Sequence, residues 1–114
     1  MKVYIAGPYT KGDVGENVHT AIKVAEQVVN MGHTPFVPHL SHFWHLIRPR
    51  PYEFWLDYDL VWLRVCDVVL RYPGESLGAD REVRVAEEAG IPVCHGIDEF
   101  YRFSISQREV PNVW

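Results

Sequence analysis

The sequence lacks long apolar runs and contains only two cysteines. No stretch approaches the ~18 consecutive apolar residues of a membrane span. The N-terminal run Met1–Ala6 reaches Gly7 and Pro8 too early to be the apolar core of a signal peptide. Cys66 and Cys94 lie in apolar runs, which favours buried free thiols in a reducing compartment over a disulfide framework. We therefore expect a cytoplasmic protein that does not associate with membranes.

An excess of positive charge is also missing. The chain has 11 basic and 15 acidic residues, for a formal charge of -4. Up to Asp57 it carries five side chains of each sign, and beyond that point six basic and ten acidic ones. Binding to polymeric DNA or RNA requires a basic face that neutralises phosphates. We therefore expect no polymeric nucleic acid partner.

The length of 114 residues predicts a single domain over residues 1–114. A chain of this size buries only about two thirds of its unfolded surface. An active site built entirely within one subunit would leave little core behind it. We therefore expect a homodimer or a larger homo-oligomer with shared sites.

Short apolar runs rich in β-branched residues alternate with segments of helical periodicity. The expected strands are residues 3–6, 34–38, 67–72 and 91–95, and the expected helices are residues 18–29, 52–66, 79–89 and 98–107. Asp13 or Asn17 is expected to cap the first helix, and residues 39–51 are expected to form a histidine-rich loop. The alternation predicts an α/β fold, a doubly wound parallel sheet of the flavodoxin or Rossmann type with helices on both faces. Strand 3–6 is expected at its centre, and the prolines of 34–38 place that strand at an edge.

In such a sheet, ligands bind at the carboxyl ends of the strands, so the loops there are the first candidates for a site. The first loop, from Gly7 to Asp13, permits close approach of the backbone to a sugar or phosphate. It matches neither the dinucleotide-binding G-x-G-x-x-G pattern nor a Walker loop, which excludes those two functions on spacing. A glycine turn after a strand is also ordinary topology.

The third loop leads into a helix that is expected to begin near Gly78. Glu82 then falls in the first helical turn, where the helix dipole favours an ionised carboxylate. An ionised carboxylate can act as a nucleophile. Alternatively, Glu82 and Asp80 only stabilise the start of the helix.

Asp57 and Asp59 lie in a segment otherwise dense in tryptophan and leucine. A carboxyl group in an apolar wall tends to keep its proton, so one of these residues is a candidate general acid opposite Glu82. The alternative is that both are solvent-facing charges on an amphipathic helix.

Three histidines, His39, His42 and His45, recur at a spacing of three residues. Imidazoles one helical turn apart can share a zinc ion. Together with Phe43 and Trp44 they can instead line a flat ligand, with rings that stack on a base. Ordinary packing or surface roles are the third possibility.

Three segments in this order resemble the nucleoside 2-deoxyribosyltransferase superfamily, which includes 2'-deoxynucleoside 5'-phosphate N-hydrolases and CMP N-glycosidases. They are Lys2–Pro8, Asp57–Leu60 ahead of Cys66–Leu70, and Ser76–Glu82. The match spans most of residues 2–95. The resemblance implies a small doubly wound fold, catalysis without a metal or other cofactor, and an oligomer with sites near subunit interfaces.

The resemblance also implies individual roles. Glu82 matches the nucleophile, Tyr4 the strand-one tyrosine that orients it, and Asp59 the acid of the long helix. Ser76 matches a serine that contacts the 5'-phosphate in the hydrolase branch. A tail ending at Trp114 would, by the same resemblance, reach a neighbour's site. The full set of expected substrate contacts is Gly7, Tyr9, Thr10, His39, Trp44, Ser76 and Gly78.

The predicted function is cleavage of the N-glycosidic bond of a nucleoside or nucleoside 5'-monophosphate through a covalent glycosyl-Glu82 intermediate. The sugar would pass to water or to another base. A non-catalytic module that senses a nucleotide in the same pocket is one alternative. A zinc-bound interaction domain built on the His39 segment is another. The preferred base and sugar and the need for a 5'-phosphate stay open at this point.

Overall fold

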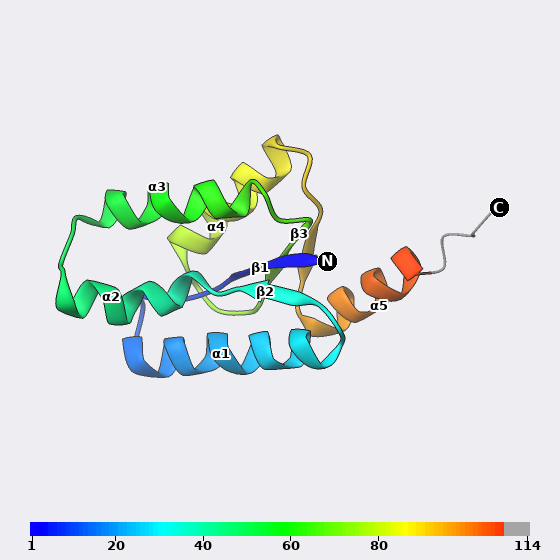
Figure 1. The fold of residues 1–114 in the computed structure, drawn as a ribbon, viewed down its shortest axis with the longest axis horizontal. Coiled ribbons are helices and arrows are strands. Elements are labelled where there is room, and N and C mark those ends of the chain that lie inside the picture. Colours follow the sequence, from blue (N-terminus) through cyan, green and yellow to red (C-terminus); the bar gives the residue numbers. More distant parts are fainter. Residues whose placement is uncertain (109–114) are drawn as a thin grey trace.

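The computed structural model describes residues 1–108, which form a four-stranded parallel sheet with helices on both faces (Figure 1). The strand order is β2-β1-β3-β4, and every neighbouring pair is parallel. The strands are β1 Lys2–Ala6, β2 Thr34–Phe36, β3 Val68–Arg71 and β4 Val93–His95. This confirms the predicted doubly wound α/β fold with its first strand inside the sheet. The tail role suggested for Trp114 lies outside the described residues.

The helices follow the predicted alternation, with two additions, η1 and α2. They are α1 Val14–Asn30, the 3-10 turn η1 Pro38–Leu40, α2 Ser41–Ile47, α3 Tyr52–Leu63, α4 Leu77–Glu88 and α5 Ile97–Arg108. Of the two candidate caps for α1, Asp13 is the one observed, since its carboxylate accepts a hydrogen bond from the Glu16 N–H at 2.9 Å. The prediction of a loop over residues 39–51 is wrong, because η1 and α2 occupy most of it. Residues 39–47 contain neither glycine nor proline, so nothing in them stops a helix.

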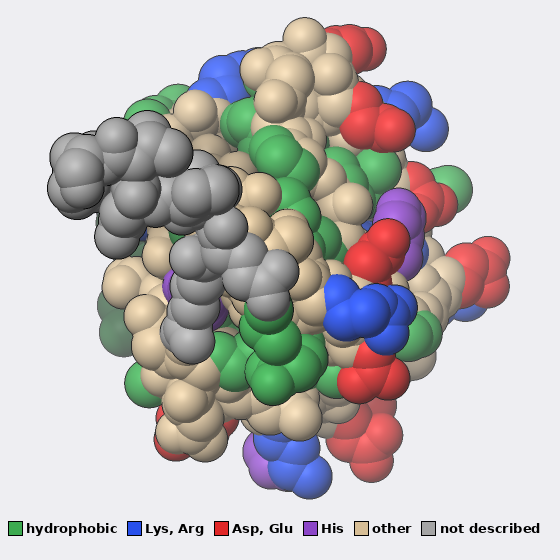
Figure 2. All heavy atoms as spheres, turned by 90° about the vertical axis from the view of Figure 1, so that its right-hand side faces the viewer, with side chains coloured by type: hydrophobic (Ala, Val, Ile, Leu, Met, Phe, Trp, Pro, Cys, Tyr) green, Lys and Arg blue, Asp and Glu red, His purple; other side chains and the backbone are tan. Residues whose placement is uncertain are grey.

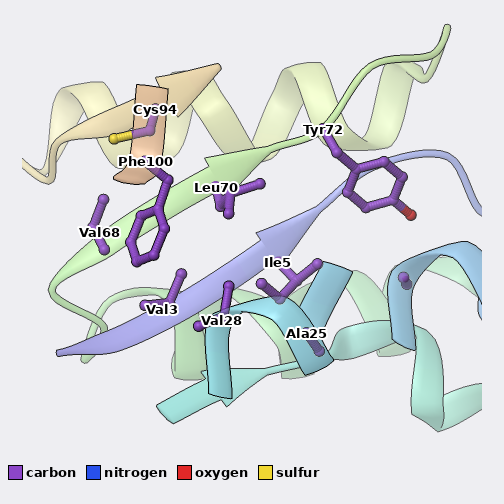
Figure 3. Close-up of a cluster of buried hydrophobic side chains, with 10 residues drawn as sticks. Val3, Ile5, Ala25, Val28, Val68, Leu70, Tyr72, Cys94 and Phe100 are labelled. Atoms are coloured by element: carbon purple, nitrogen blue, oxygen red, sulfur yellow. The ribbon is translucent and has the colours of Figure 1, made fainter. Parts of the chain in front are cut away.

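The two faces of the sheet bury separate hydrophobic clusters. Along β1, Val3 and Ile5 point to one face and Tyr4 and Ala6 to the other, and all four are fully buried. Helices α1 and α5 cover the first face, where Phe100 packs among the strand residues (Figure 3). Helices α3 and α4 cover the second face through leucine and alanine side chains. The predicted free thiols are confirmed, with Cys94 in the first cluster and Cys66 in the second.

Strand β2 forms one edge of the sheet, as predicted for residues 34–38, although it ends at Phe36 and contains only Pro35. Its three residues pair with β1 in the register Val3 opposite Pro35. The backbone N–H of Thr34 donates to the carbonyl of Met1 at 3.0 Å, so it faces inward toward β1.

Helix α4 begins earlier than the sequence suggests. The Ser76 hydroxyl accepts a hydrogen bond from the Ala79 N–H at 3.0 Å and caps a helix that starts at Leu77. The acidic residue of the first turn is therefore Asp80, and Glu82 lies in the second turn. The prediction that the helix dipole acts on Glu82 from the first turn is wrong, because that effect fades beyond the terminal turn.

The amino ends of the strands lie on the side of the molecule opposite the expected site. Figure 2 shows this face, where acidic and basic side chains are interspersed. Among residues 1–108, no helix is both long and apolar enough to cross a membrane.

Candidate active site

A cavity of about 890 Å³ lies at the carboxyl ends of the strands. Four segments enclose it: the loop after β1, the η1–α2 region, helix α3 and the start of α4. In Figure 1 this is the side where the turn between α2 and α3 projects past the sheet. The volume is in the range that holds small-molecule ligands. The predicted site residues in its wall are Gly7, Tyr9, Thr10, His39, Asp59, Ser76, Gly78 and Glu82.

The structure brings Glu82 and Tyr4 together. Glu82 is only 8% exposed, and the Tyr4 hydroxyl donates a hydrogen bond to its Oε2. Tyr4 is fully buried on the face of β1 that α4 covers, so the helix carries Glu82 directly over this hydroxyl. A buried carboxylate held by one phenol has a fixed orientation toward the cavity.

The pKa of the Glu82 carboxyl is set by opposing effects. Burial raises this pKa to about 7, while the hydrogen bond from Tyr4 and the positive charge of Arg71 act to lower it. Near neutral pH both protonation states of Glu82 are therefore populated. Tyr4 and Arg71 are the groups that favour the ionised one.

The second acid of the cavity is Asp59 of α3. Burial, and then the charge of Glu82, raise its pKa to about 8. Its Oδ1 atom is buried and has no hydrogen-bond partner within residues 1–108. Asp57, on the same helix, is exposed. Of the two candidate acids, Asp59 is thus the one in the cavity wall, and no neighbouring group counteracts the rise of its pKa as Tyr4 and Arg71 do for Glu82.

The loop after β1 passes close over a buried ring. A Cβ atom added at Gly7 would lie 2.0 Å from the ring of Tyr72, so only glycine fits there. His39 of η1 fixes the same loop, since its Nε2–H donates to the carbonyls of Pro8 at 2.9 Å and Gly7 at 3.2 Å. Burial lowers the pKa of His39, which favours the neutral ring. His39 lines the cavity, but its Nε2 is engaged with the loop.

Trp44 does not line the cavity, contrary to its predicted contact with a base. Its ring packs edge-on against Trp55 and Tyr58, with centroid distances of 5.2 and 5.7 Å. The reason is the unexpected helix α2, which turns Trp44 toward α3. Trp55 lines the cavity instead.

Sequence reasoning overlooked most of the wall that α3 provides. Tyr52, Trp55, Leu56 and Asp59 all line the cavity. Their spacing of three, four and seven residues from Tyr52 is one stripe of a helix, and this was the signal available in the sequence.

The start of α4 and the first loop complete the cavity. Ser76 lines it while capping α4, and a Cβ added at Gly78 would lie 3.0 Å from the Tyr52 hydroxyl. Lys11, which pairs with Glu75 at 3.1 Å, also lines the cavity.

The three histidines of residues 39–45 have separate partners. His39 binds backbone carbonyls, His42 shares a hydrogen bond of 2.9 Å with the Tyr9 hydroxyl, and His45 accepts one of 2.8 Å from Trp55. No group of three histidine, cysteine or carboxylate side chains in the described part of the chain is placed to hold a metal ion. The zinc hypothesis thus finds no support in the geometry of these histidines.

One family model matches residues 1–96 of the chain. The chain therefore belongs to that family, which is described as "Domain of unknown function (DUF7768)". No curated protein sequence matches the chain.

Two solved structures that share the fold are 2-deoxyribosyltransferases, the family that the sequence resembles. The enzyme from Bacillus psychrosaccharolyticus aligns with a TM-score of 0.61 and 22% identity, over 83% of this chain and 71% of its own. A 2-desoxiribosyltransferase from Leishmania mexicana aligns with a TM-score of 0.60 and 19% identity, over 82% of this chain. The chain spans 62% of that second protein. At these identities the likeness shows a shared fold.

Proposed function

We propose that this chain cleaves the N-glycosidic bond of a nucleoside or nucleoside 5'-monophosphate. The observation that carries the proposal is the placement of Glu82, hydrogen-bonded by Tyr4, in the wall of the same cavity as Asp59. The fold shared with 2-deoxyribosyltransferases supports it.

The two carboxyl groups supply what this reaction requires. Breaking the bond between C1' of the sugar and a ring nitrogen of the base builds positive charge on the sugar, and the leaving base needs a proton. Ionised Glu82 attacks C1' and forms a glycosyl ester as the bond to the base breaks. Asp59, directly or through a water, gives its proton to the departing base.

The second half of the reaction restores the carboxylate. Water or a second base attacks C1', the ester bond to Glu82 breaks, and the proton lost by the attacking group returns to Asp59. With water the product is free sugar or sugar phosphate. With a second base it is a new nucleoside, so hydrolysis and transfer share the first step.

The surroundings of the two acids favour this division of roles. Burial raises the pKa of both carboxyl groups, that of Glu82 to about 7 and that of Asp59 to about 8. Tyr4 and Arg71 counteract the rise at Glu82, whereas the charge of Glu82 adds to it at Asp59. The hydrogen bond from Tyr4 favours the negative charge on Glu82, and the buried, unpartnered Oδ1 of Asp59 favours the proton on Asp59. Retaining glycosidases likewise use two carboxyl groups with different pKa values, one as the nucleophile and the other as the acid.

The test is product analysis with a panel of substrates. Nucleosides and their 5'-monophosphates are incubated with the protein, with and without a second free base, and the products are separated by chromatography. Free base alone identifies a hydrolase, and a new nucleoside identifies a transferase. Comparing each nucleoside with its monophosphate shows whether Ser76 and Lys11 serve a phosphate.

A pair of variants on α4 separates catalysis from contamination. Glu82→Gln keeps the shape of the side chain and should lower the rate at least about 10³-fold, because the nucleophile is removed. Glu87→Gln changes an exposed carboxylate on the same helix and should keep the full rate. Equal rates in Glu82→Gln and the unmodified chain would refute the assignment. Ligand-induced thermal stabilisation with no base released would identify a non-catalytic nucleotide-binding module.

A further inference from the structure

One pair of cavity residues has no part in the proposed chemistry. His45 of α2 and Trp55 of α3 both line the cavity, and the Trp55 indole N–H donates to His45 Nδ1 over 2.8 Å. The backbone N–H of Arg50 donates to the same atom at 3.3 Å. Both partners are donors without a lone pair to offer, so Nδ1 is the unprotonated nitrogen. The ring proton of neutral His45 is therefore on Nε2.

The Nε2–H group of His45 is free to bind a ligand. His45 is half-buried, and its Nε2 has no hydrogen-bond partner within the part of the chain that the structure describes. His39 differs in this respect, because its Nε2–H is already bound to backbone carbonyls. His45, a residue that lines the cavity, thus carries an imidazole donor without an acceptor in the described part of the chain.

Neighbouring side chains hold this donor in place. Trp55 is 9% exposed, and its ring packs against Trp44 with centroids 5.2 Å apart. The Arg50 guanidinium lies 4.5 Å from the centre of the Phe54 ring, which fixes the turn between α2 and α3. A donor that is positioned before the ligand arrives loses little entropy on binding.

The position along α3 indicates which part of a ligand the donor meets. Trp55 precedes Asp59 by one helical turn, a distance of about 6 Å along the axis. In the proposed reaction, the glycosidic bond lies between Glu82 and Asp59. A base that extends from there along α3 reaches Trp55 and His45 with the edge farthest from the sugar. That edge is position 4 of a pyrimidine and position 6 of a purine.

We propose that His45 and Trp55 form a base-binding subsite that selects a carbonyl oxygen at this distal edge. The preferred bases are 4-oxopyrimidines and 6-oxopurines, since their oxygen accepts the His45 Nε2–H. An exocyclic amino group at the same position is a donor and leaves both groups unpaired. The inference rests on the proposed function, which sets the direction of the base in the cavity.

The experiment compares substrates that differ only at this position. The pairs are deoxyuridine with deoxycytidine and deoxyinosine with deoxyadenosine, and kcat/KM is measured for each. The unmodified chain should prefer the oxo member by about tenfold. This is the expected difference between a substrate that accepts the hydrogen bond and one that leaves the donor unpaired. His45→Asn keeps an acceptor near the Nδ1 position and removes the Nε2–H. It should lower kcat/KM for the oxo substrates about tenfold relative to the amino substrates, so that the preference is lost.

Two further variants make the comparison interpretable. His19→Asn changes an exposed histidine on α1 and should keep the full preference. Trp55→Phe removes the indole N–H that fixes the ring proton and should weaken the preference. It also tests the subsite if circular dichroism shows that His45→Asn does not fold. Equal losses for both members of a pair, or no preference in the unmodified chain, would overturn the subsite.

Binding measurements separate this inference from the proposed reaction. Titration calorimetry of the Glu82→Gln chain with the same four nucleosides gives Kd values without turnover. Tighter binding of the oxo members, abolished by His45→Asn, supports the subsite even if no base is released. Base release without any oxo preference supports the reaction and refutes the subsite. No binding of any of the four, or of their 5'-monophosphates, refutes the subsite.

Discussion

Replacing Asp59 with asparagine tests the electrostatics of the cavity through stability alone. Burial and the Glu82 charge raise the Asp59 pKa from 3.8 to about 8, so the fold disfavours the ionised carboxylate. Each pKa unit corresponds to about 1.4 kcal/mol, so ionised Asp59 destabilises the folded state by at most about 6 kcal/mol. The Asp59 side chain keeps partial solvent access, and part of its pKa rise comes from Glu82. We therefore expect ionised Asp59 to destabilise the fold by about 2–4 kcal/mol.

The sign of the pH dependence follows from the raised pKa. The stability associated with protonated Asp59 is fully present below pH 3.8 and is lost as the pH rises to about 8. Asp59→Asn removes this loss. The melting temperatures of the two proteins should therefore be similar at about pH 4.5, and the variant should melt about 10 °C higher at about pH 8.5. Differential scanning calorimetry across this range measures the gap.

The decisive quantity is how the difference in melting temperature between the two proteins changes with pH. An effect of the new amide that does not depend on pH cancels from this change. Asp57→Asn on the same helix is the matched control, since Asp57 is exposed. Its melting temperature should follow that of the unmodified chain at every pH. A constant gap for Asp59→Asn would show that Asp59 titrates as a solvated carboxylate and would refute the assignment of Asp59 as the acid.

Two other substitutions test the neighbours of the reactive acid. Tyr4→Phe removes the hydrogen bond that lowers the Glu82 pKa, so the acidic limb of the kcat/KM profile should move to higher pH; an unmoved limb would contradict the role of Tyr4. Gly7→Ala places a methyl group against the Tyr72 ring and should destabilise the fold by about 1–3 kcal/mol, seen as a lower melting temperature. Adding Tyr72→Leu should recover part of that loss, and strictly additive effects would show that the two positions do not conflict.

Strands and long helices were predictable because their signals are local. The runs that became β1 and β3 are apolar and β-branched, and the sheet buries them on both faces. Helix α2 was missed because seven residues do not form a stable helix alone. Its conformation depends on contacts with α3, such as the packing of Trp44 on Trp55.

The catalytic candidates were predictable as residues, but their environment was not. Tyr4, Asp59 and Glu82 follow from the resemblance, and the fold places Asp59 and Glu82 in the wall of one cavity with Tyr4 hydrogen-bonded to Glu82. From the sequence alone, the expected cause of Glu82 ionisation is the dipole of the helix that carries it. In the structure its pKa is raised by burial and held down by Tyr4 and Arg71, which come from two different strands. Such a balance depends on distances across the fold that no local pattern contains.

The proline in the middle of β2 limits how the sheet can be extended. The N–H of Thr34 faces β1, and alternation along a strand directs the nitrogen of Pro35 to the outer side. That outer side therefore lacks a hydrogen-bond donor at the centre of a three-residue strand. An additional strand from another polypeptide finds no complete ladder there, which protects the molecule from aggregation along this border.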